Sequence, residues 1–169
     1  MGKDSLARRI GQSTAKAREL LAAHKKTFKT FWGWNEGTVN YAMLEEILWT
    51  VFGWCVHVES ATNPRMLQNF LMQANGAEML RLACIIATEA GIKVCATIHD
   101  AILIEAPATE IEQTVAETQR IMAEASAIVL DGFELRTDAD IIRYPERYQD
   151  KRGEEMWHKV MGIINSLKK

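Results

Sequence analysis

Three polar side chains, Arg65, Asn69 and Gln73, recur at intervals of four residues. On a helix, each step of four residues turns the side chain by about 40°, so the three would fan across one face. Guanidinium and amide groups can donate to the purine N3 and pyrimidine O2 acceptors that every base pair presents in the minor groove. The spacing therefore predicts a helix that senses a nucleic-acid duplex without reading its sequence. The alternative is a solvated polar face.

A second candidate group is the carboxylate of Asp100, which follows an apolar run and lies beside His99. A carboxylate held rigidly at the end of a strand suits a hard, oxygen-preferring cation such as Mg²⁺. Two-metal phosphoryl chemistry needs at least one further carboxylate to place the ions roughly 4 Å apart. The candidates are Glu105, Asp138 and Asp140, although the last two also fit a solvated strand face. His99 alone indicates little, because a histidine in a turn is usually just exposed.

A long helix should carry the row of Arg65, Asn69 and Gln73. Asn63 is a suitable N-cap and Pro64 fits the first helical turn. We expect this helix to continue to about Gly91. Its second half, residues 79–87, is apolar nearly all round, which predicts burial.

A hairpin should carry Asp100. Residues 92–98 and 101–104 are rich in β-branched and apolar side chains, and Pro107 would stop the second run. Almost no residues separate the two runs. The pattern therefore predicts two strands that meet in a tight turn at His99-Asp100.

Other elements flank this central stretch. Asp4-Ser5 and Ser13 are suitable helix caps, and Gly11 and Gly37 are suitable breaks. Helices are predicted over residues 4–10, 14–30, 38–46, 110–130 and 154–167. Strands are predicted over residues 47–51, 54–58 and 133–144. The helix at 110–130 should turn a common face to the core, formed by Ile111, Val115, Ile121, Met122 and Ala125. The order predicts an α+β fold in which a small antiparallel sheet packs with helices and is preceded by helices and a β-hairpin.

The composition is that of a globular protein, with 48% hydrophobic and 25% charged residues among 169. One domain is the expectation for this length. No segment has the ~18 uncharged apolar residues of a membrane helix, and no signal core precedes the basic N-terminus, so we expect a cytoplasmic protein without a membrane partner. The net charge of −2 hides an asymmetry, because residues 1–30 hold eight Lys or Arg against two acidic residues. This basic segment is compatible with contacts to phosphate groups, and equally with a solvated helix face.

Cysteines and aromatic residues are assigned to the core. Three cysteines without a metal-binding spacing are expected to be reduced thiols inside the protein, at Cys55, Cys84 and Cys95. Four aromatic side chains lie at helical spacings of three and four, which favours core packing over base stacking: Phe28, Phe31, Trp32 and Trp34.

Two segments in order carry a family resemblance. Asn63-Pro64-Arg65 through Gln73-Ala74-Asn75-Gly76-Ala77-Glu78-Met79, followed after a helix by Ala96-Thr97-Ile98-His99-Asp100, resembles the C-terminal palm of family A DNA polymerases, the DNA polymerase I type. Order and spacing agree over about 45 residues. More weakly, Gly2-Lys3-Asp4-Ser5-Leu6-Ala7 is similar to the segment just after the nucleotide-binding fingers helix. A partial polymerase fold is implied.

The resemblance implies roles for five residues. Arg65, Asn69 and Gln73 match positions that contact the primer-template duplex in its minor groove. Asp100 matches one of two aspartates that bind the two catalytic Mg²⁺ ions, and His99 matches a histidine near the primer terminus. The family usually has Glu after this His-Asp pair, whereas Ala101 stands here.

The resemblance also implies what the family uses besides these residues. The family's first metal-binding motif and its fingers helix, with Lys and Tyr for the incoming dNTP, would precede Met1. We therefore expect residues 1–46 to be a helical fingers-base segment and residues 47–169 to be the palm portion. The family's activity is template-directed nucleotidyl transfer in DNA replication or repair. The chain is expected to be the C-terminal part of such an enzyme, without the N-terminal portion. By itself it is expected to bind duplex DNA without polymerising.

Two alternatives stay open. A non-catalytic DNA-binding subunit could complete a split polymerase with a separately encoded chain. A weaker alternative is a metal-dependent nuclease that pairs Asp100 with Asp138 or Asp140.

Overall fold

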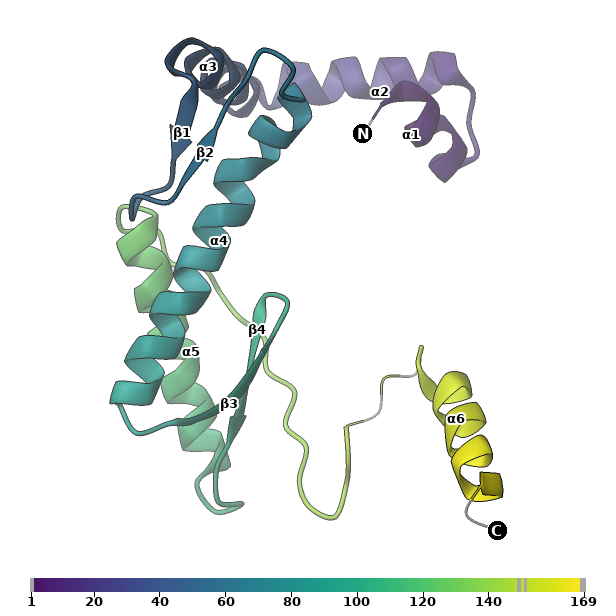
Figure 1. The fold of residues 1–169 in the computed structure, drawn as a ribbon, viewed down its shortest axis with the longest axis vertical. Coiled ribbons are helices and arrows are strands. Elements are labelled where there is room, and N and C mark those ends of the chain that lie inside the picture. The colour runs from purple at the N-terminus through teal and green to yellow at the C-terminus, as the bar shows by residue number, and fades with distance from the viewer. Residues whose placement is uncertain (1, 149, 151, 168–169) are drawn as a thin grey trace. The chain divides into compact units, whose positions relative to one another are not determined.

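The computed structural model describes residues 2–148, 150 and 152–167. These residues form an α+β fold with six helices and two small antiparallel sheets, in the order shown in Figure 1. The chain divides into two compact units, Met1–Glu78 and Met79–Lys169, which are described separately. The predicted fold class is therefore confirmed. No helix in the described ranges has the length and apolar content that crossing a bilayer requires.

The first unit begins with two short helices. α1 spans Lys3–Ile10 and ends, as predicted, at Gly11, whose φ of 64° is the left-handed conformation that glycine adopts at little cost. The predicted cap at Asp4-Ser5 is wrong, because the N-cap is Gly2 and Asp4 lies in the first turn. α2 spans Thr14–Thr27, and Ser13 Oγ accepts a hydrogen bond from the Lys16 backbone N–H at 3.2 Å, as predicted for a cap.

The third helix corrects a predicted break. α3 spans Lys29–Glu45 without interruption, although Gly37 was expected to separate two helices. Glycine inside a helix costs about 1 kcal/mol, an amount that tertiary packing readily offsets. Here the packing comes from Ala42, which is fully buried, and from Val39 against the same cluster. The helix is followed by its C-cap Glu46, whose φ of 59° is left-handed.

The aromatic residues around the start of α3 are not core residues. Phe28, Phe31 and Trp34 are exposed, and Trp32 is half-buried. They pack on one another and on His24, whose Nδ1 accepts a hydrogen bond from Trp32 Nε1 at 3.1 Å. The predicted core role is therefore wrong, because the rings pack on one another in tilted and edge-to-face pairs at the surface, around the junction of α2 and α3.

The predicted β-hairpin forms with shorter strands. β1 spans Ile47–Trp49 and pairs antiparallel with β2, Cys55–His57. The first core cluster lies where α3, this hairpin and the first part of α4 meet. Its buried members are Ala42, Leu48, Val58 and Leu67.

The long helix α4 spans Pro64–Glu89 and runs from the first unit into the second. Asn63 caps it as predicted, because its Oδ1 accepts from the Arg65 backbone N–H at 3.0 Å. The predicted burial of residues 79–87 is only partly correct. Ala83 and Ala87 are buried, whereas Ile85 is 48% exposed.

The second unit is built on a second hairpin. β3 spans Lys93–Ile98 and pairs antiparallel with β4, Ala101–Glu105, with a bulge between Val94 and Ala96. The turn falls at His99-Asp100, as predicted. Helix α5 spans Ile111–Val129, and Figure 1 shows the hairpin beside it and beside the end of α4. The second core cluster lies among these elements, with Ala87, Ile92 and Ile121 buried.

The predicted inner face of α5 is correct in part. Ile121 and Ala125 are buried, whereas Ile111, Val115 and Met122 are half-buried. Other residues complete its buried face: Thr118, Ser126 and Val129.

The predicted third strand is wrong. Residues 133–148, all of them described, contain no strand. Side chains of α5 hold the backbone of this segment instead. Gln119 Nε2 donates to the Thr137 carbonyl oxygen at 2.7 Å, and Ser126 Oγ accepts from the Leu135 N–H at 2.8 Å. An alternating sequence makes a strand only where a neighbouring strand offers a ladder, and here a helix is the neighbour. The predicted C-terminal helix is confirmed as α6, Glu154–Leu167.

The cysteines are free, as predicted, but two of them are not core residues. Cys55 and Cys95 are exposed, and Cys84 is half-buried. Cys95 lies at the bulge of β3, where an extra residue departs from the regular ladder.

Candidate nucleic-acid interface and metal-binding carboxylate

Arg65, Asn69 and Gln73 all lie exposed along the first part of α4. The helix positions them by backbone geometry alone. Gln73 follows Arg65 by eight positions, which corresponds to about 12 Å along the helix axis and about 80° around it. At 3.4 Å per nucleotide of a duplex strand, that length covers between three and four base pairs.

The opposite face of α4 is buried against the rest of the first unit. Leu67 is fully buried, and Phe70 and Leu71 pack against the cluster that contains Leu48 and Val58. From Leu67 to Asn69 the helix turns by about 200°. The apolar face therefore points inward, and the polar row is free to meet a partner in solution.

Gly2 lies close to Arg65. A Cβ at position 2 would meet Arg65 Nη2 at 3.7 Å, which is ordinary van der Waals contact. The start of α1 therefore approaches the guanidinium of Arg65. The sequence contained no signal for this contact.

His99 and Asp100 form the turn between β3 and β4, and both side chains are exposed. His99 has φ of 56°, a left-handed conformation that histidine tolerates better than bulkier residues but that costs of order 1 kcal/mol. The ladder continues to the turn, since Ile98 pairs with Ala101. The Asp100 carboxylate is therefore presented at the closed end of a paired hairpin.

The described residues do not complete a metal site around Asp100. Among them, no three His, Cys, Asp or Glu side chains lie together in a way that could hold an ion. Glu105 pairs with Lys93 at the open end of the ladder, so it lies about 14 Å from Ala101 at 3.4 Å per residue. Within the described residues, Asp100 thus offers a single exposed carboxylate of the kind that Mg²⁺ prefers.

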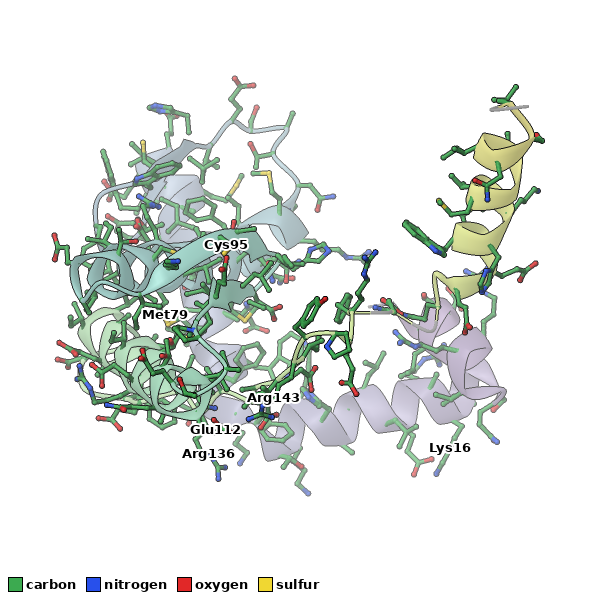
Figure 2. The ribbon with its side chains drawn as sticks, turned by 90° about the horizontal axis from the view of Figure 1, so that it is seen from below. Lys16, Met79, Cys95, Glu112, Arg136 and Arg143 are labelled. Atoms are coloured by element: carbon green, nitrogen blue, oxygen red, sulfur yellow. The ribbon has the colours of Figure 1, made fainter. Side chains whose placement is uncertain are left out.

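Asp138 and Asp140 do not share a strand face. Both lie in the segment 133–143, which forms no strand. The end of this segment is tied to α5 by an ion pair between Arg143 and Glu112, which Figure 2 shows side by side. The alternating geometry that would turn both carboxylates the same way is therefore missing.

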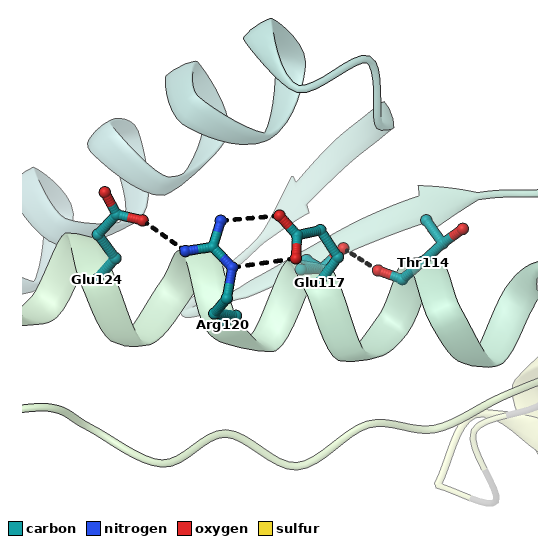
Figure 3. Close-up of polar contacts among 5 residues, drawn as sticks. Thr114, Glu117, Arg120 and Glu124 are labelled. Atoms are coloured by element: carbon teal, nitrogen blue, oxygen red, sulfur yellow. Dashed lines mark hydrogen bonds and ion pairs between the residues drawn. The ribbon is translucent and has the colours of Figure 1, made fainter.

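The exposed face of α5 carries a network of ion pairs (Figure 3). Arg120 Nη2 lies 2.8 Å from Glu117 Oε1, and Arg120 Nη1 lies 3.0 Å from Glu124 Oε2. The hydrogen bonds from Arg120 hold the pKa of Glu117 below its usual value, and those to Glu117 and Glu124 raise the pKa of Arg120. Exposed pairs of this kind contribute little to stability, so the network is a solvated helix face.

A cleft of about 430 Å³ lies at the open end of the second hairpin. Its walls include Lys93 and Glu105 from the hairpin and Glu110 and Glu117 from around the start of α5. The cleft is at the opposite end of the ladder from Asp100. It is therefore separate from the candidate metal-binding carboxylate.

The sequence matches the family model described as DNA polymerase family A over residues 1–141. The chain belongs to DNA polymerase family A. The matched range contains the row on α4 and the His99-Asp100 turn, and α6 lies outside it. The resemblance predicted from the motifs is thus confirmed.

A solved structure supports the fold. The chain is similar to the POL domain of Pol1 from M. smegmatis in complex with DNA primer-template and dNTP, with a TM-score of 0.63 and 19% identity. The match covers 73% of this chain and 24% of that chain, so the present chain spans about a quarter of its length. Among curated proteins, no match is found.

Sequence reasoning missed the buried polar residues of the first unit. Glu78 and Asn35 are each only 2% exposed. Asn35 Nδ2 donates to the Gln68 carbonyl oxygen at 3.2 Å, which links α3 to α4. A signal for Glu78 exists in the sequence, because it follows Leu67 by eleven and Leu71 by seven residues and so falls on the apolar stripe.

Proposed function

We propose that this chain is the duplex-binding palm portion of a family A DNA polymerase, with a fingers-base segment over residues 1–46 and the palm over residues 47–169. Arg65, Asn69 and Gln73 would contact primer-template DNA in the minor groove. The observation that carries this proposal is their common exposure on one face of α4 while the opposite face is buried. Donors on such a face reach acceptors that are common to all base pairs, so binding is independent of sequence.

Asp100 is proposed as one ligand of the two Mg²⁺ ions of the polymerase reaction, with His99 near the primer terminus. When bound, such ions neutralise charge on the transferring phosphoryl group. A carboxylate at the closed end of a hairpin is well held for this role, and the strained backbone of His99 fits a site whose geometry matters. Ala101 removes a side chain that the family usually provides as an auxiliary carboxylate.

These 169 residues by themselves are proposed to bind duplex DNA without extending a primer. Phosphoryl transfer depends on positioning the triphosphate and its ions, and a single aspartate, even one that bridges two ions, leaves most of their ligand positions to other groups. In this proposal, the residues that bind the dNTP and the second metal-binding aspartate lie in a further portion of the polymerase. Among the residues that the structure describes, the second sheet has two strands, each with an unpaired edge, which favours completion by a strand of that portion, in the same chain or in a separate one.

The test is direct binding followed by primer extension. Fluorescence anisotropy with a labelled primer-template should detect binding by the 169-residue chain, and Arg65→Ala should weaken it. Arg120→Ala is the matched control, because it removes an exposed arginine from α5 that is already paired with two glutamates. If both variants lost the same affinity, the loss would be explained by the change in net charge alone, and the proposed interface would be contradicted.

Primer extension tests the metal site. With Mg²⁺ and dNTPs the 169-residue chain should leave the primer unextended. Mixed with, or fused to, a polymerase portion that carries the other metal-binding motif, it should support extension that Asp100→Ala abolishes. Extension by the chain alone that depends on Asp100 would show that these residues contain a complete active site.

A further inference from the structure

The turn of the first hairpin is tied to α4 by two side chains. Thr50 Oγ1 donates a hydrogen bond to Glu78 Oε1 at 2.7 Å. The backbone N–H of Val51 donates to Asn75 Oδ1 at 3.3 Å. The same Thr50 hydroxyl accepts from the Trp54 N–H at 3.0 Å, so one side chain closes the turn and binds it to the helix.

This link is buried. Glu78 is 2% exposed and Thr50 is 7% exposed. A buried carboxylate is costly unless hydrogen bonds compensate it, so an apolar side chain would serve better if packing were the only requirement. A hydrogen bond of defined length and direction allows one register between hairpin and helix, whereas apolar contacts tolerate small rotations and slips.

The link supports α4 from behind the polar row. Glu78 follows Gln73 by five residues, which places it about 7.5 Å along the axis and about 140° around the helix. It continues the inward face of the helix, on which Leu67 is buried and Leu71 is partly buried. All of these residues belong to the first unit, Met1–Glu78. The Thr50–Glu78 hydrogen bond, together with that of Val51 to Asn75, therefore restrains the rotation of α4 about its axis relative to the hairpin, and the direction of Gln73 follows that rotation.

We propose that Glu78 is a positioning residue for duplex binding, which acts through Thr50 and the hairpin to hold Gln73 in the direction that reaches the minor groove. The inference rests on the proposed function. Glu78 does not touch the DNA in this proposal. Its role is to hold Gln73 in its binding orientation before the DNA arrives, so that binding does not have to bear the entropy cost of ordering this face of α4.

A double-mutant cycle tests the proposal. Primer-template affinity is measured at fixed salt for the 169-residue chain, Gln73→Ala, Glu78→Leu and the double variant. We expect each single variant to weaken binding by about fivefold, and Gln73→Ala to add less than about twofold in the Glu78→Leu background, since coupled residues are not additive. Glu78→Gln keeps an oxygen acceptor for the Thr50 hydroxyl and should restore binding to within about twofold.

If Glu78 only stabilised the fold, the cycle would show no coupling between Glu78 and Gln73. A smaller folded fraction lowers the apparent affinity by the same factor whether or not the Gln73 side chain is present. Independent losses, with Gln73→Ala equally harmful in both backgrounds, would overturn the positioning role and leave the proposed function standing. Unchanged binding by Gln73→Ala in the unmodified chain would instead overturn the minor-groove interface itself. If circular dichroism shows that Glu78→Leu does not fold, Thr50→Val takes its place in the cycle, because it removes the same hydrogen bond with nearly the same side-chain shape. Coupled losses with Gln73→Ala would again support the positioning role, and independent losses would overturn it.

Discussion

Gln119 Nε2 donates a hydrogen bond to the Thr137 carbonyl oxygen at 2.7 Å, so a side chain of α5 holds a segment whose sequence alternates like a strand. Ser126 adds a second anchor at Leu135. The segment 133–143 is thus fixed along a helix without joining a ladder.

Gln119→Ala should loosen this segment. Loss of one half-buried hydrogen bond is expected to lower the free energy of unfolding by about 1 kcal/mol. Amide exchange should rise between residues 133 and 140 more than in α5 itself. Gln113→Ala, an exposed glutamine on the same helix, is the control. Unchanged exchange in Gln119→Ala would mean that the segment is held by other contacts.

Arg65→Ala should weaken duplex binding about equally for all sequences. The removal of one cation should also lower the slope of log affinity against log salt by about one. Gln73→Ala, which removes an uncharged donor, should weaken binding with little change in slope. The measurement is a salt titration with AT-rich and GC-rich duplexes. A loss confined to one of the two duplexes would contradict contact through acceptors that all base pairs share.

His99→Gly should stabilise the second unit. The left-handed φ of 56° costs a residue with a Cβ roughly 1 kcal/mol, which glycine avoids. Part of that gain is lost to the entropy of glycine in the unfolded chain, so urea unfolding should show an increase of about 0.5 kcal/mol. His57→Gly on β2 is the control, and there the same chemical change should destabilise. A destabilised His99→Gly would indicate that the imidazole makes a contact worth more than the strain.

Cys84 should react with iodoacetamide more slowly than Cys55 and Cys95. Burial raises the pKa of the Cys84 thiol, which lowers the fraction present as the reactive thiolate, and the other two side chains are exposed. Peptide mass spectrometry of the folded protein at pH 8 gives the three rates. In urea the three rates should converge, and a persistent difference there would assign the effect to local sequence instead of burial.

Asp150 should titrate at a low pH. Hydrogen bonds from the Arg152 guanidinium and backbone lower the pKa of the Asp150 carboxyl to about 2. A depressed pKa stabilises the folded form above the ordinary value of 3.8, and this contribution disappears as the pH falls from there towards about 2. Carboxyl-carbon NMR gives the midpoint directly. Arg152→Ala should return it towards 3.8, and an unshifted midpoint in that variant would assign the depression to other groups.

Local chemistry in the sequence determined the elements that carry the candidate site. Asn63 and Pro64 define the start of α4, and the β-rich runs on either side of His99-Asp100 define the second hairpin, because caps and turns depend on residues that are neighbours in the chain. Once this helix forms, the four-residue spacing of Arg65, Asn69 and Gln73 places the three side chains on one face. The family motifs are also local, which is why they were readable without a structure.

Tertiary contacts decided the rest. Gly37 does not break α3, because the packing of Val39 and Ala42 outweighs the helix propensity of one residue. Residues 133–143 form no strand, because a ladder needs a partner that the sequence of the segment does not specify. The Thr50–Glu78 hydrogen bond joins residues 28 positions apart, and no local pattern indicates which distant hydroxyl a buried carboxylate will meet. Periodicity assigns a side chain to a face, and only the packed structure identifies what lies opposite that face.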